Sequence, residues 1–433
     1  MSRKLGPWMA LTLVVGNMIG SGVFLLPASL APFGWNAVFG WIVTIMGGMA
    51  LAWVFAALSR AIPKAGGPYA YTSAAFGPAA GFAVAWSYWI SLWIGNAAIC
   101  VGGVSYIGVF APDLMARPGA PVLVTGAILA ALTVVNCYGA RAAGRLQLVT
   151  TFLKLLPLAA VLAIAGAMLI RGDAPLAFHA GAIAPAPIAA ATTLALWGLL
   201  GLESATVPST KVENPLVVIP RATIIGTALT GLIYLFVCSA VTLLGDPVAT
   251  EHSDAPIADF VAAMLGPQAG MVVALFAAIS AFGALNGWIL LQGEVPWAMA
   301  CDGVFPRWLA VTSKRGAPVR AHLLSSALAA IVLCSNYTRT AGEFFTFAVL
   351  IATTAVLVAY AACSVALLWL VAQKKIEAGL GLKLAGVAGT LYSLWAIWGA
   401  GQDAMIWGLV LLLLGIPVHL AMRRSEPREQ PAH

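Results

Sequence analysis

Three ionisable side chains stand alone inside long apolar stretches of the 433-residue sequence: Lys154, Glu203 and Glu294. A charge at membrane depth is costly, so such residues are typical of gating, proton transfer or substrate binding. An enzyme acting inside a membrane would need a catalytic set, such as a Ser/His pair, paired aspartates or a metal site. One charge in each of three stretches does not provide such a set. The residues therefore favour passage of a polar solute over catalysis, and no enzyme is predicted.

Glycine and polar residues interrupt two of these stretches. One reads Gly-Asn-Met-Ile-Gly-Ser-Gly over residues 16–22, and the other reads Trp-Gly-Leu-Leu-Gly-Leu-Glu over residues 197–203. Each glycine weakens a helix by about 1 kcal/mol relative to alanine, and exposed backbone at membrane depth is tolerated only where it lines a cavity. A half-helix that begins there presents its positive end, which suits a carboxylate. Interruptions in corresponding helices of two halves indicate a transporter's central site, whereas close packing through small residues is the alternative interpretation.

The amino-acid composition places these stretches in a membrane. Apolar residues make up 61% of the chain and charged residues only 9%, against roughly a quarter charged in a soluble domain. The net charge of +7 comes from short basic clusters between the apolar stretches, which form no stripe of the kind that binds nucleic acid. The six cysteines show no metal-binding spacing, so neither a metal nor another cofactor is predicted.

Apolar stretches of about 20 residues, the length needed to cross the hydrocarbon core, predict about twelve transmembrane helices. We place them at residues 8–31, 36–59, 76–107, 120–138, 147–170, 186–209, 221–244, 268–300, 321–335, 344–372, 382–400 and 403–422. Most of the 22 Lys and Arg residues then fall in loops on one side, which the positive-inside rule assigns to the cytoplasm. The sequence thus predicts a multi-pass protein of the cell (inner) membrane with both termini in the cytoplasm.

Several motifs along the chain resemble the amino acid–polyamine–organocation superfamily, and they lie at residues 16–27, 197–205, 212–223, 287–291 and 302–306. Within that superfamily the sequence is most similar to the bacterial arginine/agmatine antiporter group. The resemblance implies an all-α integral membrane protein of the leucine-transporter type, with helices 1 and 6 broken. Its single transporter domain would comprise two inverted five-helix repeats, two extra helices and a cytoplasmic tail, at residues 1–172, 186–373, 382–422 and 423–433.

The same resemblance implies a substrate site shared by helices 1, 3, 6 and 8, with contacts from Met18, Ser21, Gly22, Asn96, Trp197, Leu200 and Trp288. Helix 1 would hold the substrate's carboxylate, and the indole of Trp288 would stack on a cation, an attraction worth about 0.5–2 kcal/mol. Tyr88 and Glu203 correspond to members of an outer gate, and Glu203 is also expected to sense protons. Tyr88 and Asn96 could instead simply bond across helices.

Lys154 and Glu294 allow more than one interpretation. A lysine at position 154 resembles those of sodium-independent transporters of the same superfamily, in which the ammonium group replaces a sodium ion. The alternative is a side chain that reaches back to the cytoplasmic interface. Glu294 fits a partner for Lys154, a proton carrier or a residue at the cytoplasmic mouth. Residues 347–352 and the pair Ser91-Leu92 depart from the arginine/agmatine pattern, and both changes would alter the far end of the substrate pocket.

Secondary transport of amino acids or amines is the predicted function, with amino acid:amine exchange of the arginine/agmatine type as the leading form. A proton-coupled or sodium-independent permease for neutral amino acids is the alternative. A channel is the alternative from another class, but it would require rings of like polar residues. The expected partners are a small amino acid or amine and membrane lipid, with a homodimer as one form of assembly; nucleic acid is not expected.

Overall fold

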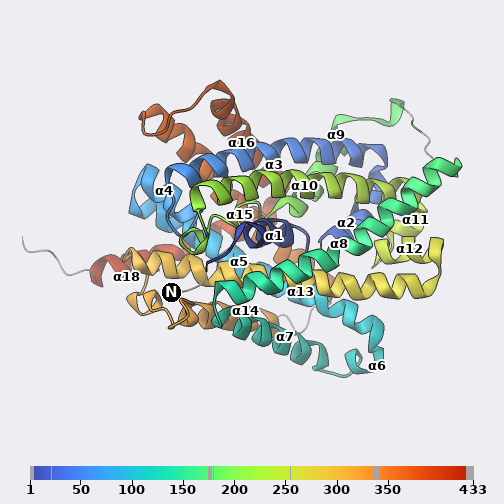
Figure 1. The fold of residues 1–433 in the computed structure, drawn as a ribbon, viewed down its shortest axis with the longest axis horizontal. Helices are drawn as coiled ribbons and strands as arrows, with labels where there is room; N and C mark the ends of the chain where they lie inside the picture. The colour runs from blue at the N-terminus through green and yellow to red at the C-terminus, as the bar shows by residue number, and fades with distance from the viewer. Residues whose placement is uncertain are drawn as a thin grey trace, which may run out of the picture.

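The structure is a computed structural model that describes residues 4–20, 22–173, 178, 180–253, 255–335 and 341–425. Helices make up nearly all of this part of the chain, and its β-structure is one isolated bridge between Leu5 and Val212 (Figure 1). Ten helices in it are long and apolar enough to cross a membrane. Two shorter apolar segments, Pro185–Leu199 and Val319–Cys334, occupy the positions predicted for the sixth and ninth membrane helices. The all-α membrane fold is therefore confirmed.

The first half of the chain contains α1 (Pro7–Met18), α2 (Gly22–Leu30), α3 (Trp35–Ala61), α4 (Pro68–Phe76), α5 (Pro78–Phe110), α6 (Pro112–Met115), α7 (Ala120–Cys137) and α8 (Ala140–Arg171). The remainder contains α9 (Pro185–Leu196), α10 (Pro215–Leu244), α11 (Pro247–Glu251), α12 (Pro256–Leu265), α13 (Pro267–Cys301), α14 (Val319–Ser335), α15 (Ala341–Ala372), α16 (Leu380–Gly399), α17 (Gln402–Leu413) and α18 (Gly415–Ser425). Many of these helices begin with proline, which has no N–H to leave unpaired and is preset for the first helical turn.

The short helix α1 lies in the middle of the bundle, where α8, α10 and α13 pack against it (Figure 1). Around this centre, α5 packs along α13 and α15, and α10 packs along α3. Large apolar side chains such as Met46, Leu123 and Trp398 are exposed on the outside of the bundle, where lipid would cover them. The long helices thus form a frame around a broken one. The N-terminus lies at the end of the bundle opposite α11 and α12 (Figure 1).

Three features differ from the helices predicted by hydropathy. The sixth helix was predicted to run to residue 209, but α9 ends at Leu196 and, after one 3-10 turn (Trp197–Leu199), residues 200–208 form consecutive turns. Gly201, with φ of +106°, adopts a left-handed conformation that ends helical geometry there. The other two are α4 and α12, with 9 and 10 residues the longer of the four short helices outside the predicted set; α6 and α11 are the others. Both α4 and α12 are too short to cross a membrane, so a search for spans misses them.

Candidate functional site

The break predicted in the first helix is present, because α1 ends at Met18 and α2 begins at Gly22. The last carbonyl groups of a helix have no helical partner and need other donors when they are buried. Lys154, fully buried on α8, supplies one: its Nζ donates to the carbonyl oxygen of Gly16 at 2.9 Å and to that of Ile19. The ammonium therefore lies inside the bundle at the break, and the alternative of a side chain that reaches the interface is wrong.

Three donors from two other helices, α10 and α13, bind the remaining carbonyls of the break. The indole Nε1 of Trp288 (α13) donates to the oxygen of Asn17 at 3.1 Å, and the hydroxyl of Tyr234 (α10) donates to that of Met18 at 2.7 Å. Ser280, also on α13, donates to the oxygen of Gly20 at 3.2 Å. These side chains bond backbone groups that would otherwise be unpaired inside the bundle, and so hold the non-helical segment in place.

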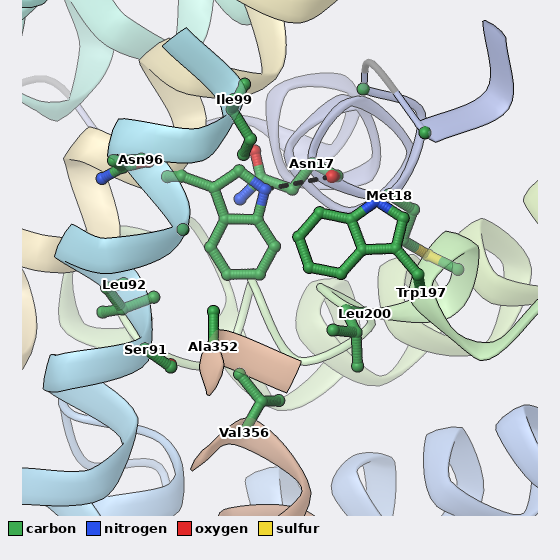
Figure 2. A pocket seen from close by; sticks show the side chains of 14 residues that line it. Asn17, Met18, Ser91, Leu92, Asn96, Ile99, Trp197, Leu200, Ala352 and Val356 are labelled. Atoms are coloured by element: carbon green, nitrogen blue, oxygen red, sulfur yellow. Dashed lines mark hydrogen bonds between the residues drawn. The ribbon is translucent and has the colours of Figure 1, made fainter. Parts of the chain in front are cut away.

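A cavity opens beside this break (Figure 2). Its walls come from α1, α2, α5, the end of α9, α13 and α15, through Asn17, Met18, Gly20, Gly22, Ser91, Leu92, Gly95, Asn96, Ile99, Trp197, Leu200, Trp288, Ala352 and Val356. Six of the seven residues predicted to bind substrate line it, and the seventh, Ser21, lies outside the described residues. The cavity offers the centre of a water molecule about 40 Å³ of space. That volume holds about three water molecules, so the side chains around it would have to move apart for an amino acid to fit.

Two glycines allow the tryptophans to approach the broken segments. A Cβ atom on Gly22 would lie 2.8 Å from the indole of Trp197, and one on Gly201 would lie 3.0 Å from that of Trp288. Figure 2 shows Trp197, Met18 and Leu200 on one side of the cavity, opposite Asn96, Leu92 and Ser91. Any larger residue at position 22 would push the indole of Trp197 out of its place beside the break.

Tyr88 and Glu203, the two residues predicted to form a gate, are in direct contact. The hydroxyl of Tyr88 donates to Glu203 Oε1 at 2.5 Å, and Tyr360 on α15 donates to the other carboxyl oxygen. All three side chains are buried, and none of them lines the cavity. Along the chain, Glu203 lies between the residues that line the cavity and Lys211. The carbonyl oxygen of Lys211 accepts a hydrogen bond from the N–H of Leu5. In the predicted orientation this is the cytoplasmic side of the cavity, whereas the resemblance implied an outer gate.

Glu294 pairs with Lys211 from the loop that follows the 200–208 turns. The carboxyl group is buried, and the Lys211 ammonium also lies 4.9 Å from the centre of the Trp297 ring. Of the three interpretations of Glu294, a partnership with Lys154 is therefore wrong, because the carboxyl group pairs with Lys211 instead. The ion pair joins the non-helical continuation of α9 to α13.

Comparison with known proteins agrees with this architecture. The sequence matches the amino acid permease family over residues 5–422. The chain belongs to this family. The permease is 34% identical to a cadaverine/lysine antiporter of Escherichia coli (strain K12) over 335 residues, which are 75% of this chain and 73% of the antiporter. It is 28% identical to a putrescine transporter of the same strain over 422 residues, 96% and 95% of the two chains. A putative arginine/ornithine antiporter of Bacillus subtilis (strain 168) is 32% identical over 399 residues, 83% of the permease and 82% of that protein.

Several residues that build this site in the permease did not emerge from the sequence. Asn17 lay within the glycine-rich motif, but its role was not predicted: it donates to Ser204 at 2.9 Å and so joins the two broken segments. Tyr234 and Tyr360 lie in long apolar helices with no local motif around them. Only their depth in a membrane helix marks them, because a buried tyrosine hydroxyl needs a partner.

Proposed function

We propose that this permease exchanges an amino acid for an amine across the cell membrane, with a cationic amino acid and its decarboxylation product as the pair. Two helix ends of opposite polarity at one cavity are the observation that carries the proposal. Helix α2 begins at Gly22, so its first N–H groups and its positive end face the break. Helix α9 ends at Leu196 and its 3-10 turn begins at Trp197, which also lines the cavity, so a negative end lies nearby.

An α-amino acid carries a carboxylate and an ammonium group on one carbon, and these two charges match the two helix ends. In this proposal the carboxylate binds the N–H groups at the start of α2, beside Gly22, and the ammonium binds carbonyl oxygens near Trp197. Met18 and Leu200 then form apolar walls of the cavity. An amine, which has no carboxylate, binds through its ammonium groups and leaves the α2 end unoccupied. Because amino acid and amine use the same cavity, they compete for it and are suited to exchange.

The side-chain end of the cavity can hold a cation without an opposite charge. No carboxylate is present among the described residues that line it, but the indoles of Trp197 and Trp288 attract cations by about 0.5–2 kcal/mol. The names of the relatives, which include cadaverine/lysine and arginine/ornithine antiporters, support cationic substrates. Arginine and agmatine stay the specific prediction. The apolar lining of Ile99, Ala352 and Val356 favours the second candidate, a permease for neutral amino acids.

Glu203 and Lys154 have different roles in the proposed cycle. The carboxyl group of Glu203 accepts hydrogen bonds from Tyr88 and Tyr360. It closes the path of the substrate on the side of the cavity that faces Leu5. A proton on it removes the charge that attracts a cationic substrate. The ammonium of Lys154 binds the carbonyl oxygens at the break in helix 1 in place of a sodium ion, as the resemblance implies.

Counterflow into proteoliposomes tests the exchange. Purified permease is reconstituted, the vesicles are loaded with unlabelled lysine, and uptake of radiolabelled arginine, agmatine, lysine, cadaverine, ornithine, putrescine and leucine is measured. We expect uptake of cationic substrates that requires an internal substrate. Equal uptake with empty vesicles would exclude exchange, and uptake confined to leucine would favour the neutral amino acid permease.

A further inference from the structure

Asn96 lines the cavity, and one of the two ends of its side-chain amide has no hydrogen-bond partner among the described residues. Its Nδ2 donates to Gln292 Oε1 at 2.7 Å, whereas its Oδ1 is buried and has no hydrogen-bond partner among the described residues. In Figure 2 the nitrogen of Asn96 points away from the side chains that surround the cavity. The two ends of an amide have almost the same shape, so the bonds that surround it must decide which end faces inward.

A chain of hydrogen bonds through α7, α14 and α13 makes that decision. It begins at the carbonyl oxygen of Leu129, which can only accept, so the hydroxyl of Thr133 uses its single hydrogen to donate there at 2.7 Å. Ser326 Oγ lies 2.7 Å from Thr133 Oγ1 and must therefore be the donor of that pair. With its hydrogen used, Ser326 can only accept from Gln292, whose Nε2 lies 2.8 Å away. Gln292 then has only its oxygen left for Asn96.

We propose that Thr133, Ser326 and Gln292 form a relay that makes the Asn96 wall of the cavity an obligatory hydrogen-bond acceptor. The consequence, which rests on the proposed transport of amino acids and amines, is selection for substrates whose side chain ends in an N–H donor. An ammonium group satisfies the free oxygen of Asn96. A side chain that ends in an acceptor leaves two buried oxygens facing each other without a proton, and this costs binding energy. The relay residues do not touch the substrate; they position the residue that does.

Thr133→Val tests the relay because valine has nearly the same shape without the hydroxyl. Ser326 then has its hydrogen free for Gln292, so both amides can turn and Asn96 can offer its NH₂ to the cavity. The measured quantity is the ratio of kcat/KM for lysine, which ends in a donor, to that for methionine sulfoxide, a neutral side chain that ends in an acceptor. We expect this ratio to fall by about tenfold in the variant, the factor for about one hydrogen bond. Norleucine, with neither group, should be transported as in the wild type.

Thr125→Val is the matched control, since Thr125 lies on the same helix and its hydroxyl donates to the carbonyl of Pro121 at 2.6 Å without joining the relay. Ser326→Ala interrupts the relay at another point and should lower the same ratio. This second variant keeps the test possible if Thr133→Val is poorly produced. In the double variant the two effects should not add, because they act on one amide.

The outcomes separate this proposal from the proposed function. If the wild type transports neither amino acids nor amines, the proposed function fails. If the wild type prefers lysine to methionine sulfoxide but Thr133→Val and Ser326→Ala leave the ratio unchanged, the relay does not set the preference. A fall in the ratio of the same size in Thr125→Val would also overturn the proposal, because it would assign the effect to helix packing.

Discussion

Replacing Lys154 with methionine removes the ammonium but keeps a side chain of similar length. The carbonyl of Gly16 then has no donor, because the N–H of Gly20, four residues on, donates to Met18 instead. A buried acceptor without a partner costs about 1–3 kcal/mol. The carbonyl of Ile19 keeps a contact with Ser280 at 3.4 Å. Against this cost, the variant no longer buries an ammonium group, which itself costs several kcal/mol.

The two effects of Lys154→Met act on different quantities. Overall stability should change little, because the unpaired carbonyl and the absent buried charge oppose each other. The geometry of the break should suffer, and a penalty of about 1–3 kcal/mol there lowers the fraction of functional sites by roughly 5- to 150-fold. We therefore expect exchange in proteoliposomes to fall at least about fivefold, with a nearly unchanged melting temperature.

Lys383→Met is the matched control, since Lys383 is exposed on α16 and loses the same charge far from the break. Wild-type exchange should be the same when choline replaces sodium, because in the proposed function the ammonium of Lys154 takes the place of a sodium ion. Normal turnover of Lys154→Met at equal protein amounts would refute this reasoning. A requirement of the wild type for sodium would refute it as well.

Three further predictions concern the cavity, the gate and the topology. Trp288→Leu should weaken the binding of arginine or agmatine by about tenfold and that of leucine much less; equal losses in a binding titration would indicate packing alone. Glu203→Gln should flatten the pH dependence of exchange between about pH 4 and 7, because ionisation of Glu203 attracts a cation and protonation ends the attraction; a less stable variant with the wild-type profile would assign the carboxyl to structure. After replacement of the exposed native cysteines, an impermeant thiol reagent should label His252→Cys in intact cells and miss Lys314→Cys; the reverse pattern would invert the topology.

The break in helix 1 could be predicted because it leaves a mark in one short segment. Three glycines within residues 16–22 cannot sustain a stable helix, and the polar residues among them have no reason to face lipid. The sequence also places Lys154 within a membrane helix, but it leaves open whether the ammonium stays inside the bundle or reaches the cytoplasmic interface. Its partners could not be predicted, because which carbonyls an ammonium reaches depends on how α8 crosses α1.

The end of α9 is the opposite case. The sequence stays apolar beyond Trp197. Hydropathy does not distinguish a helix from a series of turns that is buried inside the protein. The turns exist because Tyr88, Tyr360 and Asn17, from distant parts of the chain, bond to this segment. The pairing of Glu294 with Lys211, 83 residues away, has the same cause. Local patterns predict where a chain departs from a helix, but not what it meets there.

The ammonium at the break has a consequence for the energy source of the permease. An ion that diffuses through a membrane can do work as its gradient runs down, but a charge covalently attached to α8 never leaves. In the proposed exchange, the driving force then comes from the two exchanged solutes and from the membrane potential. If a singly charged amino acid enters as a doubly charged diamine leaves, one charge moves outward in each cycle, against the usual inside-negative potential. At 100 mV that costs about 2.3 kcal/mol, which the concentration ratios of the two solutes must supply.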